Sequence, residues 1–227
     1  PRIAMVDFAL DDSFTAPLPP ELREVEPFCL RARSRLFPGP LDPAQDWEQF
    51  GCHKIAGFPP EPEFLAKASP AAVLVPVVRR EHGLSIVLTE RAAHLSTHAG
   101  QVAFPGGRVE PGENAAQAAL REAQEEIGLA PSHVEPLGYL PPYFSGTGYR
   151  VQPLVAVLGP GTEFTANANE VARLFEVPLA HALDTRRYRR GEIFWRGQER
   201  SFFILDYPDA YIWGVTAGIM RSFADRF

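Results

Sequence analysis

Residues Gly107–Leu129 read GRVEPGENAAQAALREAQEEIGL, and this stretch of the sequence decides the expected fold. Alanine and leucine, both strong helix formers, recur between Asn114 and Ile127. Gly128 follows as a stop, because glycine readily adopts the left-handed conformation that ends a helix. The segment therefore predicts one helix that begins near Asn114 and ends before Gly128.

Three glutamates share one face of this expected helix. Glu122, Glu125 and Glu126 stand at positions i, i+3 and i+4, which brings their Cβ atoms within about 6 Å of one another. Like charges at this spacing repel, so a hard divalent cation is a good candidate to compensate them. Mg²⁺ takes oxygen ligands and commonly bridges carboxylates to substrate phosphates. The triplet alone is also typical of an ordinary solvated helix face, and both interpretations stay open.

The residues around these glutamates follow a longer pattern. Its glycine and charged positions are Gly107, Glu113, Arg121, Glu122, Glu125, Glu126 and Gly128. From average residue usage, seven such matches would arise by chance in a chain of this length on the order of once in a million. This spacing resembles the Nudix box of the Nudix hydrolase superfamily. Ala123 departs from it, because the family usually carries a larger aliphatic residue there, and this affects packing beneath the helix.

The resemblance implies the α+β Nudix fold, a mixed β-sheet sandwiched between α-helices (α/β/α), with the box forming loop-helix-loop. It also implies Mg²⁺ or Mn²⁺ as the cofactor. The metal ligands that it implies are the carbonyl of Gly106 and the carboxylates of Glu122, Glu125 and Glu126. Glu113 and Arg121 correspond to the supporting pair that holds the loop against the helix.

The general base of the implied hydrolysis is less defined. Nudix enzymes often recruit a carboxylate from outside the box. Glu170 is the first candidate, because it opens EVARLFEVPL, residues 170–179, which resembles a family stretch beside the site. Glu170 as a surface carboxylate or an extra metal ligand, and Glu125 as the base instead, are alternatives that stay open.

The segment before the box points to a substrate. Residues 88–107 read LTERAAHLSTHAGQVAFPGG and resemble the signature of coenzyme A pyrophosphatases, apart from Ser96, where that subfamily usually has arginine. The matching residues are Leu88, Thr89, Arg91, Ala92, Gly100, Phe104, Pro105, Gly106 and Gly107. The resemblance implies hydrolysis of coenzyme A or its thioesters. The products would be adenosine 3',5'-bisphosphate and 4'-phosphopantetheine or its acylated form.

Three charged or titratable side chains are candidates for substrate contact. Arg91 suits a phosphate, because a guanidinium matches phosphate geometry, but it suits a salt bridge at a strand end equally well. His94, His98 or Arg108 could replace the cation that is missing at Ser96, although both histidines are also typical of ordinary loop histidines. His94 and His98 alone are too few for a zinc site, which normally takes three or four protein ligands.

Aromatic residues form a further candidate group. Tyr143, Phe144 and Tyr149 follow a Pro-Pro turn and could stack on adenine, with Tyr149 the residue assigned to substrate binding. Aromatic residues at such spacing more often belong to a core. The segments GTGYRVQPLVA, residues 146–156, and WGVTAGIM, residues 213–220, extend the coenzyme A pyrophosphatase resemblance through most of the chain.

The chain divides into two expected parts. Residues 1–70 are a proline-rich N-terminal arm with one helix over Glu21–Leu36, and residues 71–227 are the Nudix hydrolase domain. Expected strands cover residues 71–80, 83–91, 134–140, 149–158 and 170–179, with a hairpin from 192–197 and 201–207. Residues 92–107 are expected to be a loop, and residues 211–227 a closing helix.

Composition and the absence of certain motifs disfavour several classes of function. The net charge of −6 disfavours broad binding to nucleic acid or acidic membranes, and 45% apolar residues suffice for a buried core. Cys29 and Cys52 are more typical of free thiols than of a disulfide. No signal peptide is evident, and the most apolar run, residues 71–78, is too short to span a bilayer, so we expect a cytoplasmic protein. No P-loop and no serine-histidine-aspartate pattern is visible.

Three functional hypotheses follow. The first is a coenzyme A diphosphatase, and the second is a Nudix hydrolase for ADP-ribose or another nucleoside diphosphate derivative. The third is a non-catalytic domain that senses a nucleotide. Sensing domains typically lose box glutamates, whereas this chain keeps them, which favours an enzyme. The expected partner is a small nucleotide such as coenzyme A, and a homodimer is left open.

Overall fold

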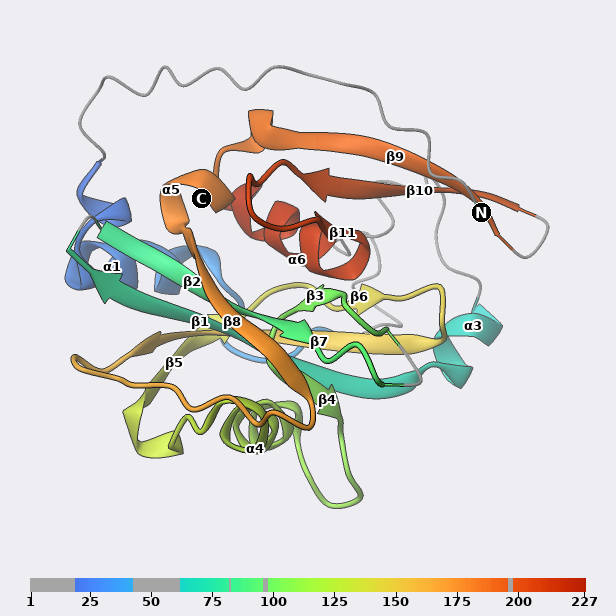
Figure 1. Ribbon diagram of the computed structural model, residues 1–227, viewed down its shortest axis with the longest axis horizontal. Helices are drawn as coiled ribbons and strands as arrows, with labels where there is room; N and C mark the ends of the chain where they lie inside the picture. The colour runs from blue at the N-terminus through green and yellow to red at the C-terminus, as the bar shows by residue number, and fades with distance from the viewer. Residues whose placement is uncertain (1–18, 43–61, 82, 96–97, 196–197) are drawn as a thin grey trace.

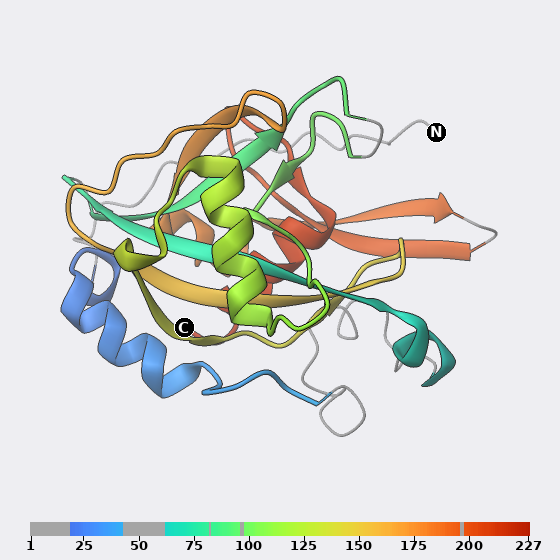
Figure 2. The ribbon, with the colours of Figure 1, turned by 90° about the horizontal axis from the view of Figure 1, so that it is seen from below.

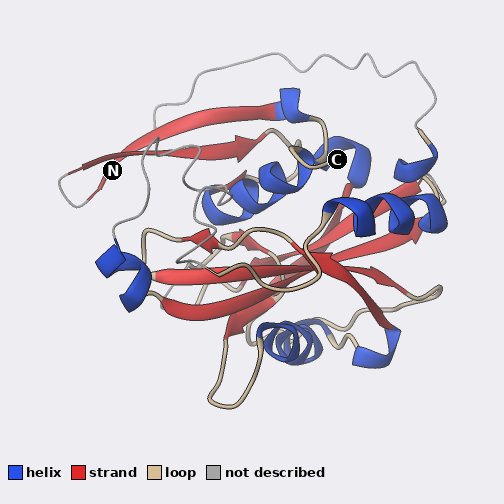
Figure 3. Cartoon of the chain, turned by 180° about the vertical axis from the view of Figure 1, so that it is seen from behind, coloured by secondary structure: helices blue, strands red, loops and turns tan. Residues whose placement is uncertain are grey.

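The computed structural model describes residues 19–42, 62–81, 83–95, 98–195 and 198–227 (Figure 1). Over these residues the chain forms an eight-stranded mixed sheet and a separate three-stranded sheet. Seen from below, helix α4 crosses one face of the main sheet (Figure 2). Seen from behind, α6 and the small sheet lie on the other side (Figure 3). The expected α+β sandwich is confirmed, and no described helix has the length and apolar character needed to cross a bilayer.

The helices differ widely in length. They are η1 (Pro20–Leu22), α1 (Val25–Arg35), α3 (Pro62–Lys67), α4 (Ala115–Ile127), η3 (Pro131–His133), α5 (Leu179–Ala182), η4 (Thr185–Arg187) and α6 (Gly214–Ala224). The strands of the main sheet are β1 (Ser69–Arg80), β2 (Gly83–Arg91), β3 (Val102–Ala103), β4 (Gly106–Arg108), β5 (Val134–Tyr139), β6 (Tyr143–Phe144), β7 (Tyr149–Leu158) and β8 (Val171–Pro178). The small sheet consists of β9 (Tyr188–Trp195), β10 (Gln198–Leu205) and β11 (Ile212–Trp213).

A fork at the centre of the main sheet positions the site. β1 and β2 pair only over residues 77–80 and 83–86, next to their connecting turn. Away from this turn, β1 and β2 separate. There β1 pairs with β4, and β2 pairs with β3. β1 is also paired in parallel with β7 along its other edge. Residues 102–108 therefore fill the space between two diverging central strands.

Burial on both faces explains the unbroken apolar run of β1. Val75 and Val77 belong to the core cluster that also contains residues of α1, α6 and the small sheet. Leu74 and Val78 point to the opposite face and pack with the apolar side of α4. Such a strand cannot show alternation between apolar and polar residues, since neither face meets solvent.

The ends of α4 follow from its sequence. Asn114 is the N-cap, and its side chain accepts from the Gln117 N–H while the Gln117 side chain accepts from the Asn114 N–H. Gly128 ends the helix in the left-handed conformation, with φ of 66°. Ala123 is fully buried beneath the helix. The predicted bounds of this helix are thus confirmed to within one residue.

Two predicted helices are too long. The helix expected over Glu21–Leu36 begins only at Val25, because Pro27 lacks an N–H and its ring would clash with the carbonyl of Arg23. The closing helix begins at Gly214 rather than Tyr211, because β11 pairs with β10 before the helix starts. The expected loop over residues 92–107 is also wrong in part, since it contains β3 and the start of β4.

The N-terminal helix α1 packs into the main core. Phe28 is fully buried and contacts Phe223 edge-on and Phe227 in a stacked arrangement. Cys29 on the same helix is a half-buried free thiol, whereas Cys52 lies outside the described residues. The division of the chain at residue 70 stays a prediction.

Candidate active site

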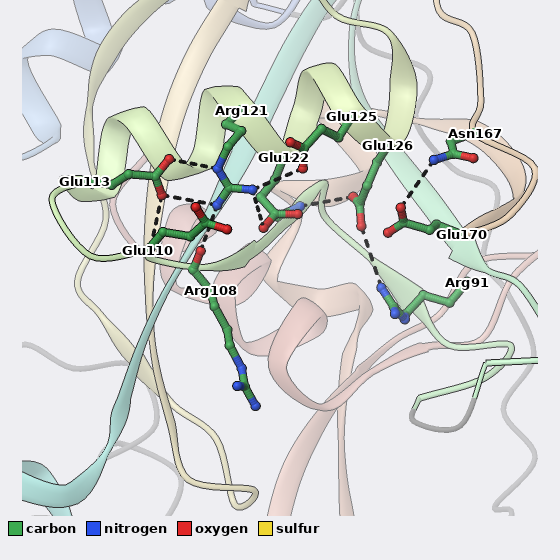
Figure 4. A network of polar contacts seen from close by, with 11 residues as sticks. Arg91, Arg108, Glu110, Glu113, Arg121, Glu122, Glu125, Glu126, Asn167 and Glu170 are labelled. Atoms are coloured by element: carbon green, nitrogen blue, oxygen red, sulfur yellow. Dashed lines mark hydrogen bonds and ion pairs between the residues drawn. The ribbon is translucent and has the colours of Figure 1, made fainter.

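Helix α4 presents its three glutamates in very different surroundings (Figure 4). The Glu126 side chain is 5% exposed and that of Glu122 is 16% exposed, whereas Glu125 is 54% exposed. The interpretation of this face as ordinary and solvated is therefore wrong for Glu122 and Glu126. Burial of two carboxylates is costly unless they are compensated, so the contacts of each oxygen matter.

Glu126 lies between strand β4 and the end of strand β2. Its Oε2 accepts a hydrogen bond from the Gly106 N–H at 3.1 Å, and its Oε1 is 3.6 Å from Nη1 of Arg91. Burial nevertheless raises the pKa of Glu126 to about 7, because these two partners compensate only part of the lost hydration. Glu126 is thus a carboxylate whose charged form a cation would strongly stabilise.

Glu122 rests against the backbone of Gly107. A Cβ atom at position 107 would lie 2.3 Å from Oε1 of Glu122, so only glycine lets the carboxylate approach this closely. Burial raises the pKa of Glu122, although the Arg121 guanidinium counteracts this. The two glycines therefore serve different glutamates. Gly106 donates its N–H to Glu126, and Gly107, which has no side chain, leaves room for the carboxylate of Glu122.

Arg121 joins the loop before α4 to the acidic face. Its Nε and Nη2 donate to the two oxygens of Glu113 at 2.8 and 3.1 Å. Its Nη1 donates to Glu122 at 2.9 Å and to Glu125 at 3.1 Å, and Nη2 also reaches the Arg108 carbonyl at 3.0 Å. The hydrogen bond from Arg121 lowers the pKa of Glu113. One guanidinium therefore holds three carboxylates and a strand of the fork together.

Glu170 approaches the acidic face from the segment before β8. Its negative charge contributes to the raised pKa values of both Glu122 and Glu126, which places it near them. Its carbonyl accepts from the Ala92 N–H at 2.8 Å, next to Arg91. Figure 4 shows its carboxylate beside Arg91 and Glu126. The structure thus brings Glu170 to the box residues from a distant part of the chain.

Asn167 is a polar neighbour of this site that the sequence reasoning missed. Its Nδ2 donates to Oε1 of Glu170 at 3.2 Å, and its backbone N–H donates to the carbonyl of Glu126 at 2.9 Å. The motif NANE, residues 167–170, carries no spacing typical of a site. Its closeness to Glu170 along the chain was the one available signal.

Two candidates for substrate contact lie away from the acidic face. The Arg108 side chain donates to the Tyr149 hydroxyl at 3.1 Å from Nε and 2.6 Å from Nη2, with its guanidinium 5.4 Å from the ring centroid. Arg108 follows Gly107 on β4, and neighbouring residues of a strand point to opposite faces. Because Gly107 faces α4, the Arg108 side chain projects from the other face of the sheet, as Figure 4 shows.

The remaining candidates are divided between a loop and the core. His98 is exposed, adopts a positive φ of 57° and contacts Oε1 of Gln101 through Nδ1 at 2.8 Å. Tyr143 and Phe144 are buried at 8% and 7% exposure, which supports the core alternative for both. Ser96 lies outside the described residues.

The donor set fits a hard cation, although the side chains are not gathered around one point. Across the described residues, no three His, Cys, Asp or Glu side chains are close enough together to hold a metal ion in this conformation. Glu122 and Glu125 turn to Arg121, and Glu126 turns to the Gly106 N–H. All candidate donors are oxygens, and the two buried ones have pKa values raised mainly by lost hydration. Such carboxylates suit Mg²⁺ or a similar divalent ion.

Comparisons by sequence find relatives of this chain. The family model of the NUDIX domain matches residues 68–194. The Escherichia coli (strain K12) protein "Uncharacterized Nudix hydrolase NudL" is 47% identical over 155 residues, which cover 68% of this chain and 80% of that protein.

Solved structures match more distantly. The Ap4A hydrolase binary complex of C. elegans has a TM-score of 0.43 and 23% identity, covering 51% of this chain and 83% of that one. The NUDIX domain of Shewanella oneidensis NrtR, complexed with ADP ribose, has a TM-score of 0.40 and 20% identity, covering 55% of this chain and 86% of that one.

Proposed function

The chain belongs to the Nudix hydrolase family, and from that premise we propose that it cuts the pyrophosphate bond of coenzyme A or its thioesters. The broader activity is that of a Nudix pyrophosphatase acting on nucleoside diphosphate derivatives. The products in the proposed reaction are adenosine 3',5'-bisphosphate and 4'-phosphopantetheine or its acylated form. We further propose a cytoplasmic location, and whether the chain forms a homodimer stays open.

One observation carries the catalytic part of the proposal. The buried Glu126 and the largely buried Glu122 lie beside the glycine pair of the central fork, with a third carboxylate, Glu170, directed at them. A solvated face would leave these carboxylates in water, and a structural core would not contain them. The arrangement suits a site that holds cations against a diphosphate.

Each box residue has a proposed role. Glu122, Glu125 and Glu126, together with the Gly106 carbonyl, would hold Mg²⁺ or Mn²⁺. When bound, the divalent cation would neutralise the negative charge of the diphosphate oxygens and lower the pKa of a nearby water. Glu113 and Arg121 position the ligand helix, because Arg121 fixes both the loop and two of the glutamates through five hydrogen bonds.

Glu170 is the proposed general base. Its carboxylate faces Glu126, whereas the carboxylate of Glu125 is bonded to Arg121 and largely exposed. In the proposed step, the oxygen of a water attacks one phosphorus while Glu170 accepts the proton of that water. The bond from this phosphorus to the bridging oxygen breaks, and the departing phosphate carries away the bonding electron pair.

Four residues are proposed to contact the substrate. Arg91 lies nearest the acidic face, 3.6 Å from Glu126, so its guanidinium suits the oxygens of the cleaved diphosphate. Arg108 and Tyr149 form a pair on the opposite face of the sheet, and His98 lies on the loop after Arg91. These three suit more distant parts of the nucleotide.

The choice of coenzyme A rests on residues 88–107, which carry the signature described above. In the fold this segment runs from the end of β2 to β4, and it supplies Arg91, Gly106 and Gly107 to the surroundings of Glu122 and Glu126. The segment that resembles the substrate signature therefore also borders the acidic face. That position supports a role in substrate choice.

A substrate panel tests the proposal. The full chain is incubated with Mg²⁺ or Mn²⁺ and coenzyme A, acetyl coenzyme A, ADP-ribose or NADH, and the products are separated by chromatography. We expect adenosine 3',5'-bisphosphate from both coenzyme A compounds at far higher kcat/KM than hydrolysis of ADP-ribose. A preference for ADP-ribose would replace the proposed substrate with the second candidate. Nucleotide binding without any hydrolysis would support a sensing domain instead.

A further inference from the structure

The segment before β8 closes the C-terminal end of α4. The last carbonyls of a helix have no partner within the helix and must find donors elsewhere. Here the Thr165 N–H donates to the carbonyl of Ile127, and the Asn167 N–H donates to the carbonyl of Glu126, both at 2.9 Å. The backbone at residue 167 is therefore held in register with the helix that carries the acidic face.

The side chain of Asn167 uses both of its polar ends. Its Oδ1 accepts from the Asn169 N–H at 3.2 Å, and its Nδ2 donates to Oε1 of Glu170 at 3.2 Å. The backbone of Glu170 is held separately, because its N–H donates to the Asn167 carbonyl at 2.9 Å and its carbonyl accepts from Ala92. The backbone hydrogen bonds therefore fix the main-chain position of Glu170, and the Asn167 amide restrains the orientation of its carboxylate.

We propose that Asn167 is a positioning residue that aims the Glu170 carboxylate at the acidic face of α4. The inference rests on the proposed role of Glu170 as general base. An amide N–H bound to Oε1 leaves Oε2 available to accept a proton from water. A proton transfer group works only within hydrogen-bond reach of its partner, so an unrestrained carboxylate would spend less time in the productive position.

The amide chemistry of Asn167 also suits this place. Glu122, Glu126 and Glu170 already bring three carboxylates together, and a fourth would add repulsion. An asparagine donates to Glu170 without adding charge, and its oxygen still closes the turn to Asn169. The donor and the turn-forming acceptor are different atoms of one side chain, which allows a substitution to separate them.

Asn167→Asp is the separating variant, because aspartate keeps an oxygen that can accept from the Asn169 N–H but loses the N–H that reaches Glu170. Asn167→Ala removes both contacts. Asn169→Ala is the matched control, since Asn169 is exposed and is joined to Asn167 through its backbone N–H. Each variant is made alone and combined with Glu170→Gln. Turnover is measured with Mg²⁺ on both coenzyme A and ADP-ribose, so that a wrong choice of substrate does not hide the effect.

The expected result is a fall in kcat with little change in KM. Loss of a hydrogen bond to a charged group predicts about tenfold lower kcat for both Asn167 variants, with Asn169→Ala close to wild type. Loss of a general base predicts at least about 100-fold lower kcat for Glu170→Gln. In the Glu170→Gln background, the Asn167 substitutions should lower kcat no further, because Asn167 acts through Glu170.

Two outcomes overturn the inference alone: undiminished kcat in both Asn167 variants, or an equal fall in kcat when Glu170 is already glutamine. The second would mean that Asn167 only supports the loop. Undiminished kcat in Glu170→Gln would instead remove the proposed base, and the inference with it. Hydrolysis of ADP-ribose but not coenzyme A would refute the proposed substrate and leave the role of Asn167 measurable.

Discussion

The backbone N–H of Gly106 donates to the Glu126 carboxylate at 3.1 Å, which joins strand β4 of the central fork to the last turn of α4. Glu126 is one of the most deeply buried charged side chains in the part of the chain that the structure describes. The contact shows how the glycine loop and the acidic helix form one unit. A substitution at Gly106 should therefore alter the position of the Glu126 carboxylate, and a substitution at Glu126 should alter the loop at Gly106.

The two neighbouring glycines should respond differently to alanine. In Gly106→Ala, the new methyl group would lie 2.4 Å from the Ala72 carbonyl oxygen, so the backbone must move and the protein should lose on the order of 2 kcal/mol of stability. In Gly107→Ala, the atoms nearest to the new methyl group belong to the carboxylate of Glu122, a side-chain end that can turn away without moving the backbone. This variant should keep its Tm within a few degrees yet lose most of its kcat. Gly159→Ala, whose new methyl group would be 3.8 Å from its nearest neighbour, is the control in thermal melts and turnover assays.

Glu126→Gln should abolish hydrolysis while leaving the fold intact. Glutamine keeps the size of the side chain and can still accept from the Gly106 N–H, but it is a poor ligand for a divalent cation. We expect kcat to fall by at least about 100-fold, with an unchanged circular dichroism spectrum. Glu110→Gln, an exposed acid in the loop before α4, should be close to wild type. Unaltered turnover by Glu126→Gln would refute the ligand assignment.

The metal-free protein should become less stable as pH rises from about 5 to about 8 through the titration of Glu126. Its folded pKa of about 7 lies above the ordinary value of 4.5, so the folded state binds this proton more tightly than the unfolded state. The resulting stabilisation is complete below the ordinary pKa and is lost as pH rises through 7. It amounts to on the order of 3 kcal/mol.

Unfolding by urea in EDTA at a series of pH values measures this dependence. Glu126→Gln serves as the reference, because it has no proton to release and should show a flatter stability profile over this range. Addition of Mg²⁺ at about pH 8 should raise the Tm of the wild type and not that of the variant. Parallel pH profiles for the two proteins would contradict the buried, protonatable state of Glu126.

Arg121→Lys should weaken both the fold and the activity. Lysine has a single ammonium group, which cannot replace the planar guanidinium that reaches Glu113, Glu122 and the Arg108 carbonyl together. We expect a loss of about 1–3 kcal/mol in urea unfolding and a clear fall in kcat. Arg33→Lys is the control, because Arg33 forms an exposed pair with Glu135 and should cost little.

Phe28→Ala tests whether α1 belongs to the same folded unit as the catalytic domain. Phe28 is fully buried against Phe223 and Phe227, so its removal should cost about 3–5 kcal/mol and lower the Tm in a single cooperative transition. Leu30→Ala, on the exposed side of α1, should change stability by less than about 0.5 kcal/mol. Separate unfolding of α1 in Phe28→Ala would support the division of the chain at residue 70.

Elements with a strong local pattern could be predicted from the sequence. Helix α4 has a capping asparagine and a terminating glycine, and β7 has an apolar run between polar turns, so their bounds agree with the prediction. The short strands β3 and β4 could not be predicted in the same way. A segment of two or three residues is too short to show periodicity. These strands form because β1 and β2 diverge, which leaves backbone groups on the facing edges of both strands to pair with β4 and β3.

The shared helix face of the glutamates could be predicted, but their unequal burial could not. Consecutive helix residues differ by about 100° in direction, so Glu125 and Glu126 meet different surroundings on that face. Which of them is covered depends on where β4 lies, and that position is set by pairing with β1. Asn167 escaped prediction for a related reason, because its contact with Glu170 depends on a backbone hydrogen bond to a distant helix end.

The segment in the central fork should be among the slowest in the molecule to exchange its amide protons with solvent. The Leu74 N–H donates to the Pro105 carbonyl at 2.9 Å, and the Val109 N–H donates to the Pro70 carbonyl at 3.1 Å, on either side of the glycine pair. Because β1 is paired along both edges there, these amides are freed only when the whole domain opens. One wall of the proposed active site should therefore open no more often than the domain itself unfolds.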